Sequence, residues 1–275
     1  MRFGRITKTT LDQATATNTR TNVAVGLANV GYGLSTVSSV APSSLGAISG
    51  VGNAQPMIGQ TKFASLQSDG TLPYEVAGLS VTINGVAVPV LYASPWGVKF
   101  FMPPVSEGIA EVIVSSQDGY ICQGLVSVER NGSRIVTTND DDNGFAVIGD
   151  NQTVITSNFN VTSPGNFGTD KRTRLSFFAS GISGSVSNTV TSNDVNVNGN
   201  IRPNLAEGVA VEARVAATGQ IYMLPVQFAG AQGVLPGLDQ VTVMLVPELK
   251  GSGAVQLTLI VNGRRSGGAP TVFIN

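Results

Sequence analysis

The 275-residue chain contains no histidine, which removes several kinds of chemistry. A Ser-His-Asp triad, a Cys-His pair and a histidine-based metal site all need an imidazole as base or ligand. The single cysteine, Cys122, excludes an intrachain disulfide and a cysteine metal site. We interpret Cys122 as a small buried strand residue. Neither a phosphate-binding loop nor a dinucleotide-binding fingerprint is present.

Carboxylates are the remaining groups that could catalyse a reaction, because a glycosidase needs only two of them. They are scattered along the chain, and no spacing pairs them in one cleft. The glutamates considered are Glu75, Glu107, Glu111, Glu207 and Glu212. Isolated carboxylates are usually solvated. We therefore predict a protein that is not an enzyme.

Two polar loops have the oxygen-rich spacing of calcium-binding loops. The first places Asn139, Asp141 and Asn143 at alternate positions before a glycine. Asp150 then stands where the closing carboxylate of a twelve-residue loop falls.

The second loop fits only the opening of such a motif. Asp194, Asn196 and Asn198 precede a glycine, but Leu205 occupies the closing position. No helical pattern flanks either loop, so neither is an EF-hand. A solvated Asx-turn loop is the alternative that we favour for both. Structural calcium is the only cofactor that the sequence suggests.

The composition indicates short strands joined by tight turns. Only 12% of the residues are charged, while 33 are Gly and 13 are Pro. Asn84-Gly85 separates Val81–Ile83 from Val86–Val88, and this dipeptide predicts a hairpin with a type I′ turn. The net charge of −1 argues against a nucleic-acid surface. The apolar runs are too short for a membrane span.

Three pairs of segments repeat at long range, which indicates two copies of one β domain. Residues 89–93 match 225–229, residues 98–103 match 241–247, and residues 108–114 match 253–259. We predict an all-β fold of two Ig-like (Greek-key) β-sandwich domains with an extended N-terminal arm. The expected ranges are 1–58 for the arm and extension, 59–138 for the first domain and 139–275 for the second.

These segments resemble the Solibacter-type C-terminal repeat domain, an Ig-like module of bacterial surface proteins, over about residues 75–275. The resemblance rests on Val81–Gly85, Pro89–Pro95, Phe228–Gly230, Pro236–Val241 and Val261–Gly263. The chain departs from the family at residues 98–101, where a Gln-Ile-Asn-Phe-like strand is expected. The Gly-rich first strand seen at residues 178–182 has no clear equivalent before Leu79. The resemblance implies export and a binding or structural role, with no catalytic residues.

The N-terminal arm is the most informative feature for function. A polar segment of about 20 residues cannot bury enough apolar surface to order itself. A segment of alternating branched and small side chains follows it: Asn22, Val23, Ala24, Val25, Gly26, Leu27 and Ala28. Because the first domain is short of a convincing first strand, we predict that residues 21–30 are a donor strand for a neighbouring subunit. The alternative is an edge strand on the arm's own domain.

Head-to-tail strand donation does not close on itself and therefore builds a filament. We predict an extracellular or cell-surface structural protein, the subunit of a pilus-like filament whose partners are copies of itself. A monomeric adhesin or carbohydrate-binding module with a surface glycan as ligand is the alternative. The low charge and the richness in Ser, Thr, Asn and Gly favour an extracellular site, although no signal peptide is visible.

Overall fold

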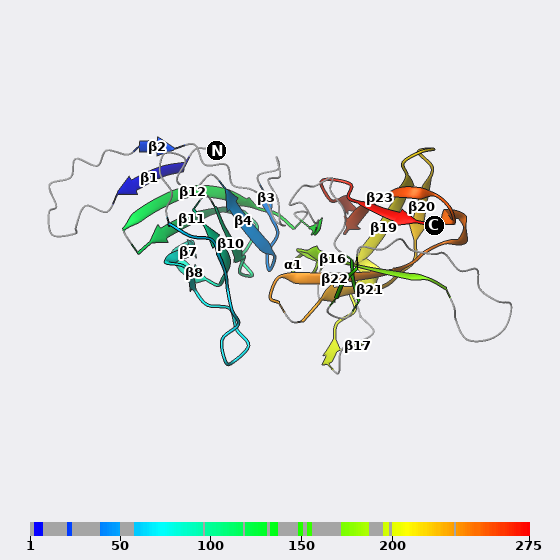
Figure 1. Ribbon diagram of the computed structural model, residues 1–275, viewed down its shortest axis with the longest axis horizontal. Coiled ribbons are helices and arrows are strands. Elements are labelled where there is room, and N and C mark those ends of the chain that lie inside the picture. The colour runs from blue at the N-terminus through cyan, green and yellow to red at the C-terminus, as the bar shows by residue number, and fades with distance from the viewer. Residues whose placement is uncertain are drawn as a thin grey trace.

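The computed structural model describes residues 3–7, 21–23, 39–49, 58–95, 97–117, 119–130, 133–136, 148–150, 153–155, 172–186, 195–197, 200–233 and 235–275. Their regular secondary structure is almost all β-strand, so the predicted all-β fold is confirmed. The strands form two lobes that lie side by side (Figure 1). The first lobe contains the strands up to β12, and the second contains the strands from β13 onward.

The first lobe consists of two sheets. The larger sheet has the order β2-β1-β12-β11-β7-β6, with β8 beside β7 and β3 parallel to β12. Its strands are β1 (Phe3–Thr7), β2 (Thr21–Val23), β3 (Ser39–Val40), β6 (Glu75–Val76), β7 (Leu79–Ile83), β8 (Val86–Val88), β11 (Gly108–Ser116) and β12 (Tyr120–Val128). The smaller sheet, β4-β10-β9-β5, contains β4 (Leu45–Ser49), β5 (Lys62–Phe63), β9 (Val90–Ser94) and β10 (Gly97–Phe101).

Alternation along the strands creates the core between these two sheets. Leu79, Val81 and Ile83 of β7 are buried, while the residues between them are half-buried. Val98 and Phe100 of β10 alternate in the same way and join the same cluster. Because side chains on a strand point alternately to opposite faces, each sheet presents one apolar face to the other. This is the packing of a β-sandwich.

The second lobe repeats this arrangement. One sheet has the order β15-β14-β16-β22-β21 with β13 beside β16, and the other has the order β20-β19-β23-β24 with β25 beside β23. The strands of the first sheet are β13 (Arg134–Ile135), β14 (Ile148–Asp150), β15 (Thr153–Ile155), β16 (Arg174–Ser180), β21 (Val226–Ala231) and β22 (Leu238–Met244). Those of the second are β19 (Val209–Val215), β20 (Ile221–Leu224), β23 (Gly253–Val261), β24 (Arg264–Arg265) and β25 (Thr271–Ile274).

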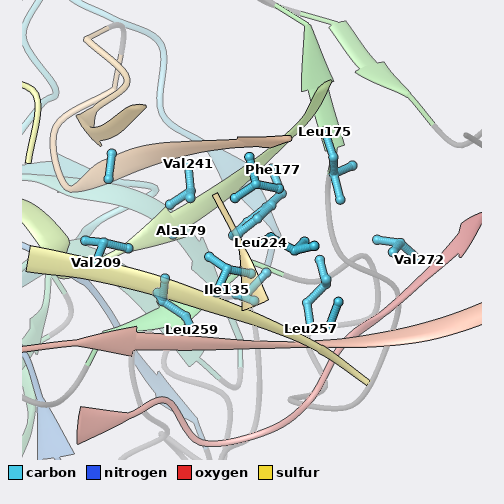
Figure 2. Packing of buried hydrophobic residues seen from close by; sticks show 14 of the residues in the cluster. Ile135, Leu175, Phe177, Ala179, Val209, Leu224, Val241, Leu257, Leu259 and Val272 are labelled. Carbon is cyan, nitrogen blue, oxygen red and sulfur yellow. The ribbon is translucent and has the colours of Figure 1, made fainter. Parts of the chain in front are cut away.

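A separate hairpin and three single-turn helices complete the described part of this lobe. They are β17 (Val195–Val197), β18 (Asn200–Arg202), α1 (Ile182–Ser185), η1 (Ala206–Gly208) and η2 (Pro247–Leu249). Figure 2 shows the core, in which Phe177 and Val241 of one sheet face Leu257 and Leu259 of the other.

Two Asn-Gly turns lie in the described part of the chain, and both adopt the backbone that this dipeptide favours. Asn84 and Gly85 have φ values of 48° and 79°, and Asn262 and Gly263 have values of 50° and 77°. Positive φ at both central residues is the requirement of a type I′ turn. The predicted hairpin at residues 81–88 is therefore confirmed as β7–β8.

The strand pairing follows the same order in both lobes. In the first lobe β10 lies between β4 and β9, and in the second β22 lies between β16 and β21. Likewise β7 pairs with β8 and β11, and β19 pairs with β20 and β23. The same order of connections therefore produces both sandwiches.

Even a local irregularity repeats. Each lobe has a one-residue bulge two positions after a proline, at Leu91 after Pro89 and at Gln227 after Pro225. In each lobe the proline carbonyl accepts a 2.9 Å hydrogen bond from the partner strand. Proline has no N–H to donate, so it is tolerated where a strand begins and its carbonyl alone is paired.

The first lobe has a first strand of its own, so the expectation that it lacks one is wrong. β4 pairs with β10 in the position that β16 takes beside β22. This strand comes from the range that the sequence analysis assigned to the arm and extension. β13 likewise pairs with β16 of the second lobe, ahead of the boundary expected at residue 139.

Close packing explains why β4 does not resemble a strand in the sequence. A Cβ added at Gly46 would lie 2.6 Å from the ring of Phe100, which is fully buried. The position therefore requires glycine, although glycine weakens a strand and lacks the side chain by which strands are recognised.

We predict that Gly46→Ala destabilises the protein by about 1–3 kcal/mol, because the added methyl group overpacks the ring of Phe100. The measurement is urea unfolding followed by tryptophan fluorescence. Gly59→Ala is the matched control, since a Cβ at Gly59 meets nothing within 4 Å. Equal unfolding midpoints for the two variants would contradict the packing argument.

Candidate strand-addition site and the inter-lobe junction

The outer edge of β12 is the candidate site for strand addition. β1 pairs with it in antiparallel register, with Gly4 opposite Gln123 and Arg5 opposite Cys122. β2 then pairs with the far side of β1 and, among the described strands, with no other. The N-terminal segment is therefore attached to the sheet by main-chain hydrogen bonds along one strand. This is the arrangement of β-strand addition, within a single chain.

Two of the predicted donor residues lie next to this strand. Asn22 and Val23 are in β2, opposite Gly4 and Phe3 of β1. Ala24, Val25, Gly26, Leu27 and Ala28 lie outside the described residues. The strand that adds to the body of the lobe is thus β1, which the sequence analysis placed in the polar arm. Phe3 and Ile6 fall on opposite faces of a strand, so the sequence offered no alternation by which β1 could be predicted.

Most of the predicted calcium ligands lie outside the described residues, namely Asn139, Asp141, Asn143, Asp194 and Asn198. Asp150 ends β14, opposite Thr153, and Asn196 lies in β17, opposite Ile201. Across the described ranges, no group of three or more His, Cys, Asp or Glu residues could hold a metal ion. Structural calcium stays a prediction.

The glutamates considered for catalysis lie on several different elements. Glu212 on β19 binds Arg265 at 2.6 Å, and Glu107 lies 3.8 Å from Arg130. Glu75 accepts a hydrogen bond from the side chain of Gln117. Glu111 lies on β11 and Glu207 in η1. These contacts give Glu75, Glu107 and Glu212 local structural roles. The absence of enzymatic activity stays a prediction.

An apolar cluster joins the two lobes. Leu45 of β4 and Leu91 of β9 come from the first lobe, and Val136 and Leu238 come from the second. All four side chains are buried. Because burying an apolar side chain is worth about 1.5–3 kcal/mol, this cluster favours one fixed arrangement of the lobes.

A buried serine adds a directional contact at the same place. The hydroxyl of Ser180 accepts a 2.8 Å hydrogen bond from the backbone N–H of Leu45. It donates a second hydrogen bond, also 2.8 Å, to the carbonyl of Gly237. Gly184 brings the backbones together, since a Cβ there would lie 1.9 Å from the carbonyl oxygen of Pro42.

Asp239 holds the turn of the second lobe that faces this junction. Its carboxylate accepts hydrogen bonds from the backbone N–H groups of Ile182 (2.7 Å) and Ser183 (3.3 Å), and from the Ser183 hydroxyl. The side chain is only 1% exposed. Burial raises the pKa of Asp239 to about 6, against the lowering effect of the hydrogen bonds from Ser183 and Ile182.

The sequence analysis did not identify Ser180 or Asp239 as special. Both lie near the ends of strands, where polar residues are common, and the segments that contain them, 178–182 and 236–241, entered the sequence analysis only as part of the family resemblance. The one usable signal was the Ser180-Gly181 pair directly after a confident strand, because such a pair marks a turn.

A cleft of about 340 Å³ opens beside the junction, and its walls include Pro42, Pro104, Arg130 and Gly184. Its charged group, Arg130, is more than half exposed and is paired with Glu107. The cleft is therefore a solvent-filled gap beside the lobe contact and offers no buried polar group to a ligand.

No protein-family model matches the chain, and no curated protein is significantly similar to it. Within the part of the chain that the structure describes, none of the helices has the length and apolar character needed to cross a membrane. Function has to be inferred from the strand edges, the sheet faces and the junction themselves.

We predict that the stabilising effect of Asp239 falls as the pH rises from about 4 to about 6. The folded-state pKa, about 6, lies above the ordinary value of 3.8, so in this window the folded chain holds a proton that the unfolded chain has lost. The stability of the wild type relative to Asp239→Asn should therefore decrease by about 3 kcal/mol between pH 4 and pH 7. Urea unfolding at a series of pH values measures it.

Asp69→Asn is the control for this experiment. The pKa of the exposed Asp69 is lowered by hydrogen bonds from the side chain and backbone of Thr71. The stabilising effect of Asp69 is therefore complete above pH 5 and is lost only at lower pH. The difference in the free energy of unfolding between Asp69→Asn and the wild type should therefore stay constant from pH 5 to pH 7. The chain has no histidine to titrate in this window. If the difference in unfolding free energy between Asp239→Asn and the wild type is also constant over this pH range, the raised pKa of Asp239 is refuted.

Proposed function

We propose that the chain is a non-enzymatic structural protein of the cell surface, the subunit of a pilus-like filament. In the filament, β1 of one copy adds to β12 of the next copy. The observation that carries the proposal is the antiparallel pairing of the N-terminal strand with the edge of a nine-residue strand. A pairing made by main-chain groups is the same whether the donor belongs to the same chain or to a neighbour.

The attachment of the hairpin β1–β2 supports an exchange between copies. Residues 24–38 connect it to β3, and 15 residues can span up to about 50 Å when extended. The donor strand of one copy can therefore reach the acceptor edge of a neighbour. Swapping a terminal element in this way keeps the contacts of the closed monomer, so it costs little free energy.

The acceptor edge gives a reason for the exchange. Without β1, the N-terminal half of β12 exposes a row of unpaired N–H and C=O groups, which invites pairing with other chains. Filling this edge with a strand of an identical copy satisfies the same hydrogen bonds. Because donor and acceptor lie at different places on each copy, the contact is head-to-tail and can continue indefinitely.

We predict that Arg5→Cys forms disulfide-linked multimers through Cys122, the only native cysteine. Arg5 and Cys122 are directly opposite each other, and such positions on antiparallel strands bring their Cβ atoms about 4.5–5.5 Å apart. Exchange between copies gives a ladder on non-reducing gels that collapses on reduction. Mixing Arg5→Cys/Cys122→Ser protein with wild type should give a crosslinked dimer, because neither chain can then crosslink internally.

Ile6→Cys is the matched control, because Ile6 lies opposite Ile121 and is out of register with Cys122. It should crosslink much less than Arg5→Cys. Electron microscopy of the same samples tests whether the multimers are filaments. A crosslink formed only within monomers, with no dimer in the mixing experiment, would overturn the proposal and leave β1 as an ordinary edge strand of its own lobe.

A further inference from the structure

Strand β20 forms an open edge of the second lobe. It pairs with β19 on one side and, among the described strands, with none on the other. Figure 1 shows that β20 and the N-terminal strand β1 lie in different lobes, toward opposite ends of the molecule. The edge of β20 is therefore separate from the edge of β12, to which β1 is attached.

The main-chain groups that point away from β19 belong to Ile221 and Met223. Bonded and non-bonded pairs alternate along an antiparallel ladder, and here Gln220 accepts a 2.9 Å hydrogen bond from the N–H of Val215. Counting from that pair, Tyr222 is at a bonded position, whereas Ile221 and Met223 are at non-bonded positions. Their N–H and C=O groups therefore face the open edge, and among the described residues these groups have no hydrogen-bond partner.

Ile221 and Met223 also expose apolar side chains at this edge, with exposed fractions of 48% and 54%. A protected edge strand usually has a charged side chain, a proline or a bulge that prevents it from pairing. Ile221–Leu224 contains neither a charged residue nor a proline, and its ladder with β19 has no register shift. β20 therefore lacks these devices and is open to another strand.

We propose that β20 pairs with β20 of a second copy of the chain, in antiparallel orientation across a two-fold axis. With Tyr222 on the axis, Ile221 of each copy lies opposite Met223 of the other. The N–H and C=O groups of both residues then all have partners in this register. The contact joins the second-lobe sheets of two copies into one continuous sheet.

The side chains on the outer face of the joint sheet are complementary. Arg214 of β19 lies opposite Ile221, and Glu212 lies opposite Met223. A row across the two copies therefore starts at Arg214, passes through Ile221 and Met223, and ends at Glu212 of the other copy. Apolar side chains meet in the middle of each row, and the charges that flank them have opposite signs.

Other strands of a second copy fit this edge less well than β20. β8, which takes the corresponding place in the first lobe, has three residues and is joined to β7 by a two-residue turn. The residues that flank such a turn bond to each other, so Ala87 alone faces outward on β8. β1 contains the charged Arg5 and is paired on both sides, with β12 and β2.

A two-fold contact closes on itself and produces a dimer, whereas head-to-tail strand addition continues indefinitely. The pairing of β20 uses neither β1 nor β12, so it does not depend on the proposed filament. If both contacts form, pairing of β20 links subunits of neighbouring filaments side by side.

Disulfide formation tests the register, with Cys122→Ser in every protein so that each chain carries one cysteine. Ile221→Cys and Met223→Cys are oxidised separately and as an equal mixture. The mixture should give about tenfold more disulfide-linked dimer than either protein alone, because the proposed register brings only the Cβ atoms of residues 221 and 223 to about 4.5–5.5 Å across the axis.

Val86→Cys mixed with Met223→Cys is the matched control, because Val86 is an exposed residue of the corresponding strand β8. This mixture should give no more dimer than the single proteins. Thermal unfolding verifies that the variants are folded. A lack of dimer in the mixture of Ile221→Cys and Met223→Cys, or an equal yield from the Val86→Cys mixture, would overturn the proposal.

A charge at the edge provides a second test. Met223→Lys should raise the dissociation constant of the dimer at least about tenfold, as measured by sedimentation velocity of the full chain, whereas Val86→Lys should leave it unchanged. Met223→Lys should also leave the crosslink between Arg5→Cys and Cys122 unaffected, so a failure of this proposal is distinguishable from a failure of strand addition. Equal dissociation constants for Met223→Lys and Val86→Lys would contradict pairing through β20.

Discussion

The edge of β10 has to be filled, and much of the structure depends on how this is done. β4 supplies the missing hydrogen bonds along the whole of that edge. The same strand presents Leu45 to the second lobe, where its N–H donates to Ser180 and its side chain enters the apolar cluster. One short segment thus completes a sheet and anchors the junction, because its two faces and its backbone have different partners.

The junction converts two similar sandwiches into one unit with defined surfaces. Its apolar cluster covers the part of the first lobe's smaller sheet that contains Leu45 and Leu91. A buried hydrogen bond makes the contact directional, since Ser180 of the second lobe accepts from the backbone N–H of Leu45 in the first. Asp239 fixes the neighbouring turn within the second lobe, where it accepts from the N–H of Ile182. A purely apolar contact would allow the two lobes to slide past each other, whereas a buried hydrogen bond between them is lost if they shift.

The strand edges and the sheet faces of this protein offer two different kinds of binding surface. A strand edge offers a row of identical main-chain groups, which suits the repeated joining of copies. A sheet face offers side chains, which can select a ligand by shape and charge. In this protein the edge of β12 carries β1, whereas the face of the smaller first-lobe sheet carries Leu45 and Leu91, which meet the second lobe.

The sequence by itself determined the features that depend on neighbouring residues. Alternating branched residues predicted β7, and Asn-Gly predicted the turns, because positive φ at Asn84 and Gly85 is a local property of those residues. The matching segments after Pro89 and Pro225 predicted a repeat, and the strands that follow these two prolines bulge at the same place in the structure. These signals come from neighbouring residues, so they can be recognised in a single sequence.

Only the tertiary structure decided where β1 and β4 lie, which residues meet at the junction and which aromatic side chains stay exposed. Gly46 belongs in a strand because Phe100 fills the space where its side chain would be, and these residues are far apart in the chain. The buried carboxylate of Asp239 is bound by a turn 56 residues earlier. The residues in these contacts are far apart in the sequence and meet only in the folded chain. No local pattern in the sequence could therefore reveal them.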